Sequence, residues 1–432
     1  MAPTTAARFL ASATRQVCRS TSSSGSSSLL GAASTRGASA AVIRSPQLDG
    51  ASASAGSTIA RRGNATAVEA PGTKQWSRED VQQVYDTPLM DLIFRAASVH
   101  RVNHPSDQVQ LCTLLNIKTG GCGEDCSYCA QSSKYSDKVG LKAEKLTEVE
   151  PVLVEARKAK ANGSTRFCMG AAWRDLSGRK RGFERILKMV EGVRSYIPAI
   201  DRALDMEVCT TLGMLSPEQA QQLKKAGLTA YNHNLDTSRE YYPKVITTRK
   251  YDERLETLAA VREAGISVCS GGIIGLGEDD GDRVGLIWEM SQLPEAPESF
   301  PVNALVAIPG TPLEKNDRVT VTELLRTIAT ARIVLPTSII RFAAGRISYS
   351  ESEQAMCFMA GANAIFTGER MLTTPTSGWD EDISMLTRWG LKGMKSFESA
   401  TVRMKEDEAA LKATEERKAI AEAESAQAQA QI

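Results

Sequence analysis

Three cysteines lie within eight residues of the chain. Cys122, Cys126 and Cys129 stand at spacings of four and three in the stretch GGCGEDCSYCAQS. The chain has nine cysteines, an odd number, and the organelle predicted below keeps thiols reduced, so disulfides are not expected. An iron–sulfur electron carrier normally supplies four thiolates per cluster, but this local set stops at three. The spacing therefore predicts a [4Fe–4S] cluster with one iron open to a small molecule.

Zinc is the alternative metal that these residues allow. His100 and His104 form an H-x₃-H pair that could join Cys126 and Cys129 in a four-ligand site. Such a site would leave Cys122 unused, and the stretch VHRVNHP fits the end of a helix better. The three-cysteine loop therefore favours a cluster.

The elements that must position these thiols alternate between strand and helix. A helix is expected over 77–100, where Ser77 and Asp80 fit a capping box. Strands are expected in eight stretches: QVQLCTLLNI, STRFCMG, LDMEVCTT, LTAYNHNLD, ISVCSGGIIGLG, PVNALVAIPG, SIIRFAAG and ANAIF. Amphipathic helices are expected between them, for example over 147–161, 216–226 and 252–264.

This alternation predicts an α/β fold of parallel strands with right-handed crossovers. Eight units predict a (β/α)₈ TIM-type barrel with an N-terminal helical extension, and a doubly wound sheet is the alternative. Chemistry in a barrel of this kind lies at the carboxyl ends of the strands. Three further cysteines and an arginine lie at or near such ends: Cys168, Cys209, Cys269 and Arg341. We therefore expect them to meet the cysteine loop at one mouth.

The two ends of the chain have low sequence complexity. Residues 1–68 contain seven Arg, no Lys and one acid, a net charge of +6. An Arg-rich, Ser-rich, acid-poor leader predicts an organellar transit peptide, mitochondrial rather than plastid, with a merely disordered tail as the alternative. We expect a leader over 1–70, a barrel domain over 71–398, and a low-complexity helical or disordered tail over 399–432.

The charge of the body excludes some partners. Without the leader, the totals of 52 basic and 51 acidic residues become 45 and 50, a net charge of −5. This balance predicts no general affinity for nucleic acid. No run approaches the roughly 18 apolar residues of a membrane span, so no membrane association is expected.

A family resemblance rests on these same motifs. C-x₃-C-x₂-C with an aromatic residue before the last cysteine, here Tyr128, is the signature of the radical S-adenosylmethionine (SAM) enzymes. Six stretches, within about residues 75 to 395, together resemble the biotin synthase family: GGCGEDCSYCAQS, GSTRFCMGAAW, YNHNLDTS, VCSGGIIGLGE, GTPLEKND and QAMCFMAGANAIF. Gly123 stands where many members carry proline, and RDLSGRKRGFE is a variable loop.

The resemblance implies two clusters. Cys122, Cys126 and Cys129 would hold the catalytic [4Fe–4S] cluster, whose open iron would take SAM. A second, [2Fe–2S] cluster would be held by the matching side chains Cys168, Cys209, Cys269 and Arg341. An arginine ligand is unusual because guanidinium stays protonated, and the residues alone favour Arg341 pairing with an acid near the mouth.

The resemblance also implies contacts with small molecules. SAM would contact Tyr128, Ala171, Asn234, Asp236 and Ile273, and the substrate would contact Asn232 and Asn303. Alternation along a strand would place Asn232, Asn234 and Asp236 on one face and His233 on the other, in a structural role. Strand-end capping is the alternative role for Asn232.

Three cysteines remain outside these sets. Cys18 lies in the leader, and Cys112 and Cys357 lie in apolar stretches, where buried packing is expected.

The activity implied is sulfur insertion that converts dethiobiotin to biotin, the last step of biotin biosynthesis. SAM would be cleaved to methionine and a 5′-deoxyadenosyl radical, and the [2Fe–2S] cluster would donate sulfur. Expected partners are a ferredoxin- or flavodoxin-type electron donor, the iron–sulfur assembly machinery and a second copy of the chain, in the mitochondrial matrix. The alternatives are a related radical SAM enzyme without sulfur insertion and an iron–sulfur carrier, which would not need YNHNLDTS.

Overall fold

The computed structural model describes residues 75–195, 206–371 and 373–395. The predicted leader over 1–70 and tail over 399–432 lie outside these residues. The helices are α1 (Arg78–Tyr85), α2 (Leu89–Asn103), α3 (Ser136–Val139), α4 (Val149–Ala161), α5 (Lys180–Ser195), α6 (Pro217–Lys225), α7 (Tyr242–Val245), α8 (Tyr251–Glu263), α9 (Asp280–Ser291), α10 (Val321–Val334), η1 (Arg346–Ser348), α11 (Glu351–Met359) and α12 (Trp379–Arg388). The strands are β1 (Gln108–Lys118), β2 (Arg166–Ala171), β3 (Glu207–Thr211), β4 (Ala230–Asn232), β5 (Ser267–Cys269), β6 (Gly272–Ile274), β7 (Ser299–Ala304), β8 (Ile339–Phe342), β9 (Ala364–Phe366), β10 (Arg370–Met371), β11 (Thr374–Pro375) and β12 (Lys392–Gly393).

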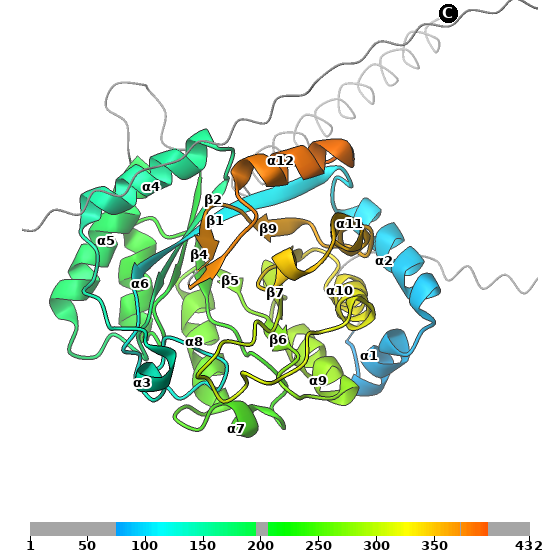
Figure 1. Cartoon of the computed structure of the whole chain (residues 1–432), viewed down its shortest axis with the longest axis horizontal. Coiled ribbons are helices and arrows are strands. Elements are labelled where there is room, and N and C mark those ends of the chain that lie inside the picture. Colours follow the sequence, from blue (N-terminus) through cyan, green and yellow to red (C-terminus); the bar gives the residue numbers. More distant parts are fainter. Residues whose placement is uncertain (1–74, 196–205, 372, 396–432) are drawn as a thin grey trace, which may run out of the picture. The chain divides into compact units, whose positions relative to one another are not determined.

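The strands close into a parallel barrel. Its order is β1-β2-β3-β4-β5-β7-β8-β9, and β9 pairs back with β1. Figure 1 shows the helices arranged around the outside of these strands. The prediction of a (β/α)₈ barrel is confirmed. Among the described helices, none is long and apolar enough to cross a membrane.

The helix predicted over 77–100 is in fact two helices. α1 ends at Tyr85 and α2 begins at Leu89, with Pro88 as its N-cap. Proline disfavours helical backbone in the residue before it, which explains the break. The capping box of Ser77 and Asp80 is present as predicted. Both helices pack against α10, so this N-terminal extension covers one side of the barrel.

The stretch ISVCSGGIIGLG, predicted as one strand, forms two short strands, β5 and β6. The strand is interrupted at Ser270 and Gly271, and both parts pair with β7 in the same parallel register. A Cβ atom on Gly271 would lie 2.1 Å from the carbonyl oxygen of Pro301, and one on Gly272 would lie 2.8 Å from that of Asp236. These glycines therefore let backbone segments of the protein approach one another closely.

Alternation along the strands separates two environments. Phe167 of β2 and Val208 of β3 point outward and pack into the large apolar core between the strands and the helices. Their neighbours Cys168 and Cys209 form a small separate cluster with Ala230 inside the barrel. Cysteine side chains therefore face the barrel interior from adjacent strands.

The two histidines of the zinc alternative lie away from the cysteine loop. The rings of His100 and His104 are 5.6 Å apart, and His104 Nε2 lies 3.1 Å from the carbonyl oxygen of Pro336. Pro336 precedes β8, at the amino ends of the strands, whereas the cysteine loop follows the carboxyl end of β1. The fold therefore does not assemble a histidine–cysteine zinc site.

His100 makes the fold sensitive to acid. It is buried, its Nε2 atom has no hydrogen-bond partner, and burial together with the nearby Arg332 charge lowers its pKa to about 3. In the unfolded chain it takes up a proton below about pH 6.5, whereas in the folded chain it stays neutral. Its contribution to stability is therefore complete above that pH and falls by about 1.4 kcal/mol per pH unit below it.

We expect the change from pH 7 to pH 5 to lower the urea midpoint of the wild-type protein more than that of His100→Phe. Phenylalanine keeps a ring in the same space but cannot take up a proton. The difference between the two shifts isolates the histidine from the carboxylates, which titrate in both proteins. Equal shifts in the two proteins would contradict this assignment.

Candidate active site

A cavity of about 320 Å³ opens at the carboxyl ends of the barrel strands. It is lined by every residue predicted to hold a cluster, SAM or the substrate: Cys122, Cys126, Tyr128, Cys129, Cys168, Ala171, Cys209, Asn232, Asn234, Asp236, Cys269, Ile273, Asn303 and Arg341. The structure thus brings together residues separated by more than two hundred positions in sequence.

The cysteine loop is anchored by the segment before α8. Asp125 accepts hydrogen bonds from the backbone N–H groups of Thr247 at 2.9 Å and Thr248 at 3.2 Å. The N–H of Ser127 donates to the carbonyl of Val245 at 3.0 Å. The loop therefore has backbone partners although it contains no long regular element.

A buried ion pair completes this anchor. Arg249 donates to Glu124 Oε1 at 2.9 Å, and each side chain is 5% exposed. The guanidinium also donates to the carbonyl of Arg174 at 2.9 Å. Because both charges are buried, each depends on the other for its stability.

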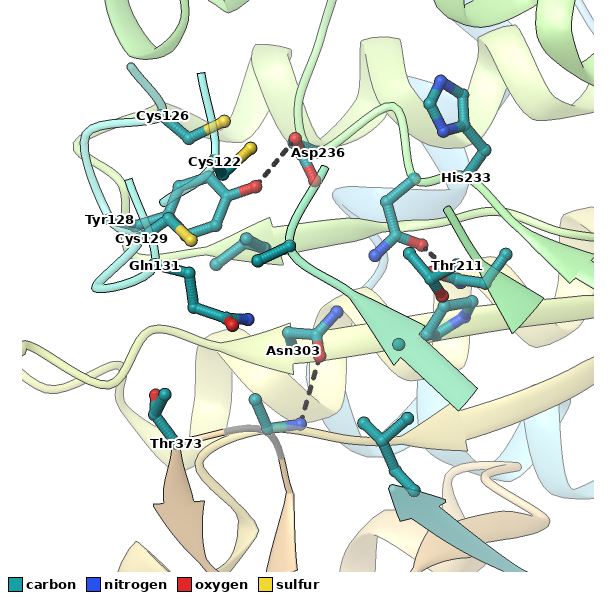
Figure 2. Close-up of a pocket in the computed structure, with 18 of the residues that line it drawn as sticks. Cys122, Cys126, Tyr128, Cys129, Gln131, Thr211, His233, Asp236, Asn303 and Thr373 are labelled. Carbon is teal, nitrogen blue, oxygen red and sulfur yellow. Dashed lines mark hydrogen bonds between the residues drawn. The ribbon is translucent and has the colours of Figure 1, made fainter. Parts of the chain in front are cut away.

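The three loop thiols lie on the side of the loop that faces Asp236 (Figure 2). Burial raises the pKa of Cys122, holds that of Cys126 well above its usual range, and raises that of Cys129 to about 11. They would therefore stay protonated without a cation, whereas binding to iron deprotonates a thiol. Among the described residues, no three His, Cys, Asp or Glu side chains converge on one metal ion. A cluster does not require this, because its thiolates bind separate irons.

Asp236 connects the loop to the barrel. Its Oδ2 atom accepts from Tyr128 Oη at 3.0 Å and from Arg254 Nη2 at 2.7 Å. Burial raises the pKa of Asp236, and the Arg254 charge and the Tyr128 hydroxyl oppose that effect. Among described residues other than glycine, it alone has a positive φ, of 70°. This left-handed backbone aims the carboxylate at the loop.

The predicted alternation of Asn232, Asn234 and Asp236 along one strand is only partly correct. β4 ends at Asn232, and the next residues follow an irregular path. All three still line the cavity, and Asn232 Nδ2 donates to Asn234 Oδ1 at 3.1 Å. His233, predicted to face the other way, also lines the cavity and lies 3.5 Å from Arg249.

The inner thiols lie deeper in the barrel. Cys168 and Cys209 are register partners on β2 and β3, and the hydrogen bond from Cys168 lowers the pKa of Cys209. Cys269 is contacted by Asn232 Nδ2 at 3.4 Å and by Arg341 Nη1 at 3.5 Å. Three thiols from three strands thus line one cavity together with Arg341, which contacts one of them, Cys269.

A polar network forms the floor beneath these thiols. Arg341 Nη2 donates to Gln110 Oε1 at 3.0 Å, and Gln110 Nε2 donates to Glu207 Oε1 at 3.1 Å. Glu207 in turn pairs with Arg166 at 2.7 Å. Arg341 thus bonds an amide and a thiol, so the acid partner favoured by the residues alone is wrong for the described part of the chain.

The floor carries an excess of positive charge. The floor holds two guanidinium groups, Arg166 and Arg341, but a single carboxylate, Glu207, which pairs directly with Arg166. All three side chains are at most 3% exposed. Arg341 Nε and Arg166 Nη1 have no hydrogen-bond partner. Buried unpaired charge is costly, so the site suits an anionic occupant such as thiolates bound to iron. The donor set therefore fits a cluster.

Sequence reasoning missed several residues of the site. Gln131, Thr211 and Thr373 line the cavity beside the predicted residues (Figure 2). Arg249 and Arg254 also line it, yet each is an arginine before or within a helix, without a distinguishing local pattern. Their partners are distant in sequence, so no spacing rule could identify them.

Two family models match the chain. The Radical SAM superfamily model matches residues 116–287, and the Biotin and Thiamin Synthesis associated domain matches residues 301–392. Together with the barrel and its three-cysteine loop, the match defines a radical SAM enzyme, which uses a [4Fe–4S] cluster and SAM.

Sequence comparison with known relatives identifies the family within this class of enzyme. The chain is 62% identical over 337 residues to the mitochondrial biotin synthase of Emericella nidulans, covering 78% of this chain and 83% of that protein. It is 58% identical over 316 residues to the mitochondrial biotin synthase of Arabidopsis thaliana, covering 73% and 81%. It is 54% identical over 317 residues to the biotin synthase of an Escherichia coli strain, covering 73% and 88%. The chain belongs to the biotin synthase family, and its activity is that of a biotin synthase.

Solved structures support the fold alone. A methylornithine synthase aligns with a TM-score of 0.63 at 18% identity, covering 76% of this chain and 97% of that one. A maturase of the [FeFe]-hydrogenase also aligns with a TM-score of 0.63, at 17% identity over 75% and 74%.

We expect Glu124→Gln to destabilise the protein strongly, because it leaves the Arg249 charge buried without a counter-charge. The expected loss is about 3 to 5 kcal/mol in the free energy of unfolding. The matched control is Glu148→Gln, whose partner Arg185 lies 2.9 Å away but whose side chain is 71% exposed. That loss should stay below about 1 kcal/mol. Anaerobic urea unfolding measures both, and similar losses in the two variants would refute the anchoring role.

Proposed function

We propose that this cavity converts dethiobiotin to biotin by inserting sulfur, with two clusters facing one substrate. The observation that carries the proposal is that the loop thiols and the inner thiols line the same cavity. A radical source and a sulfur source must both reach the same substrate carbons, and a shared cavity allows this without moving the substrate between sites.

In this proposal the loop residues Cys122, Cys126 and Cys129 hold the [4Fe–4S] cluster. The inner side chains Cys168, Cys209, Cys269 and Arg341 hold the [2Fe–2S] cluster. When bound, the first supplies the electron that cleaves SAM into methionine and a 5′-deoxyadenosyl radical, and the second supplies the sulfur. The positive floor of Arg166 and Arg341 supports the inner assignment, because it favours an anionic occupant.

The residues around the loop orient SAM. Asp236 is held by Arg254 and Tyr128, so its carboxylate is fixed before a ligand arrives and can accept from ribose hydroxyl groups. Asn234 lies beside it in the same cavity wall. Ala171 and Ile273 add small or apolar surface against which the adenosine can pack.

The residues deeper in the cavity orient the substrate. Asn303 donates to the carbonyl of Gly272 at 2.9 Å and accepts from the N–H of Ala344 at 3.1 Å (Figure 2), which fixes the direction of its amide. Asn232 is fixed by its contacts with Asn234 and Cys269. Apolar side chains such as Leu305 and Phe366 line the remaining walls and limit water and stray hydrogen donors.

We propose that the chain works in the mitochondrial matrix, with residues 1–70 as a transit peptide, 71–398 as the catalytic domain and 399–432 as a tail. The basic, acid-poor composition of the leader supports this location, as does the chain's similarity to two mitochondrial biotin synthases. Reductive SAM cleavage needs a ferredoxin- or flavodoxin-type electron donor, and a consumed cluster needs the assembly machinery. Exposed apolar side chains on α2, Met90 and Phe94, offer a surface for a homodimer.

Serine at any loop cysteine should abolish SAM cleavage and biotin formation together. Serine at Cys168, Cys209 or Cys269 should stop biotin formation but leave some SAM cleavage, because only the sulfur source is lost. Separate assays of 5′-deoxyadenosine and biotin distinguish the two sets. In a single turnover without added sulfide, enzyme with ³⁴S in the inner cluster should give labelled biotin, and unlabelled biotin would show that sulfur comes from elsewhere.

Deleting residues 1–68 should leave folding and in vitro activity unchanged but keep the protein in the cytosol, since no described element of the barrel begins before Arg78. Cell fractionation of the full-length and truncated chains measures the location. A truncated protein that still reaches the organelle would overturn the assignment of the leader.

A further inference from the structure

Two exposed basic segments flank the cysteine loop. The first covers residues 142–145, and the second covers residues 179–181 within the variable stretch RDLSGRKRGFE. Their basic side chains, all exposed, are Lys142, Lys145, Arg179, Lys180 and Arg181. Glu144 is the single acid in either segment. The two segments together form what we call the basic surface.

The first segment runs beside the backbone that precedes the first loop cysteine. A Cβ atom on Gly121 would lie 2.8 Å from the Cβ atom of Ala143. The N–H of Glu144 donates to the carbonyl of Thr119 at 2.9 Å. Lys142 and Lys145, on either side of these contacts, therefore lie close to the loop that holds Cys122.

The second segment lies beside the first and next to the cavity wall. The guanidinium of Arg179 lies 5.2 Å from the centre of the Trp173 ring, and Trp173 lines the cavity. A Cβ atom on Gly182 would lie 3.2 Å from an atom of the same ring and 3.7 Å from Leu146, the residue after the first segment. The two segments thus form one continuous surface rather than two separate ones.

The cysteine loop reaches the molecular surface at this place. Gly121 and Gly123 are exposed, and Cys122 between them is half-buried, whereas Cys126 is buried. A Cβ atom on Gly123 would have none of the described atoms within 4 Å. A protein that docks on the basic surface would therefore come close to a ligand of the loop cluster.

The fold does not account for the charges of this surface. Lys180 and Arg181 occupy the first turn of α5, which contains no acid, although the N-terminus of a helix already carries partial positive charge. Lys224 and Lys225, by contrast, lie in the last turn of α6, where the helix dipole favours them. Within the described residues, no ion pair involves any of the five basic side chains of the surface.

We propose, on the basis of the loop cluster assigned above, that the basic surface docks a small acidic protein that donates one electron. Residues 69–432 carry a net charge of −5, so the body as a whole repels such a donor, whereas the basic surface attracts it. One electron passes from the reduced donor to the cluster that the loop holds. The donor is oxidised by one electron, and no bond forms or breaks in this step. The rate of electron transfer falls steeply with distance, so docking beside Cys122 favours it.

The test uses full-length protein with reconstituted clusters and an acidic plant-type [2Fe–2S] ferredoxin as the donor. Three double variants each remove two positive charges: Lys142→Gln/Lys145→Gln, Lys180→Gln/Arg181→Gln, and the control Lys224→Gln/Lys225→Gln. The control residues precede β4, at the amino ends of the strands. Calorimetric titration gives the Kd of oxidised ferredoxin, and 5′-deoxyadenosine formation is assayed with reduced ferredoxin and, separately, with dithionite. The leader is present in every sample, so its charge contributes equally to all.

At low ionic strength, both surface variants should raise the Kd of ferredoxin and its KM in SAM cleavage by about tenfold. The difference from the wild type should shrink at high salt, which screens exposed charges. The control should match the wild type, and cleavage driven by dithionite should be unchanged in all three variants. Lys180→Gln/Arg181→Gln should keep or raise the urea midpoint, because it removes charges that the α5 dipole disfavours.

The inference is overturned if the surface variants bind ferredoxin as tightly as the wild type, or if the control loses as much affinity as they do. An equal loss of cleavage with dithionite would also overturn it, because the side chains would then act on the enzyme rather than on the donor. A wild-type protein that cleaves no SAM with dithionite would refute the loop cluster instead, and the Kd values would still test the docking surface.

Discussion

The pairing of β9 with β1 is the contact on which the rest of the site depends. It brings Ala364 beside Gln110 and Phe366 beside Cys112, which closes the barrel between its first and last strands. Arg341, one strand further on, then reaches Gln110 across the interior. Without this closure the inner arginine would face solvent, and the inner thiols would not share a cavity with the loop that follows β1.

The two thiol sets are stabilised by opposite electrostatic arrangements. The loop is anchored by a buried ion pair between Glu124 and Arg249, in which each charge has its counter-charge. The inner floor is unbalanced, because its one carboxylate, Glu207, pairs with Arg166 and leaves Arg341 without a counter-charge in contact. The ion pair at the loop needs no ligand, because its charges neutralise each other. The excess positive charge of the inner floor is neutralised only when an anionic group occupies the site. The outer site therefore fixes the position of its thiols, whereas the inner site favours a negatively charged occupant.

The interior of this barrel also departs from the usual packing. Barrel interiors are commonly filled with branched apolar side chains, but here Gln110, Glu207 and Arg166 occupy inward positions near the amino ends of their strands. Polar groups in such a place are stable only when hydrogen-bonded to one another, which limits what can change at any one position. The floor thus constrains the geometry of the thiols above it.

The sequence by itself determined what depends on short spacing. The three-cysteine loop, the capping box of Ser77 and Asp80, and eight strand-like stretches are local patterns. They predict the barrel and the inner thiols at its mouth, whereas the contacts with SAM and the substrate came from the family resemblance. The break at Pro88 was also a local signal, although the prediction overlooked it. Only the tertiary structure decided which distant side chains meet. Glu124 and Arg249 are 125 residues apart, and Gln110 and Arg341, which hydrogen-bond across the interior, are 231 residues apart. Hydrogen bonding and burial act between neighbours in space, and a single sequence records only neighbours along the chain.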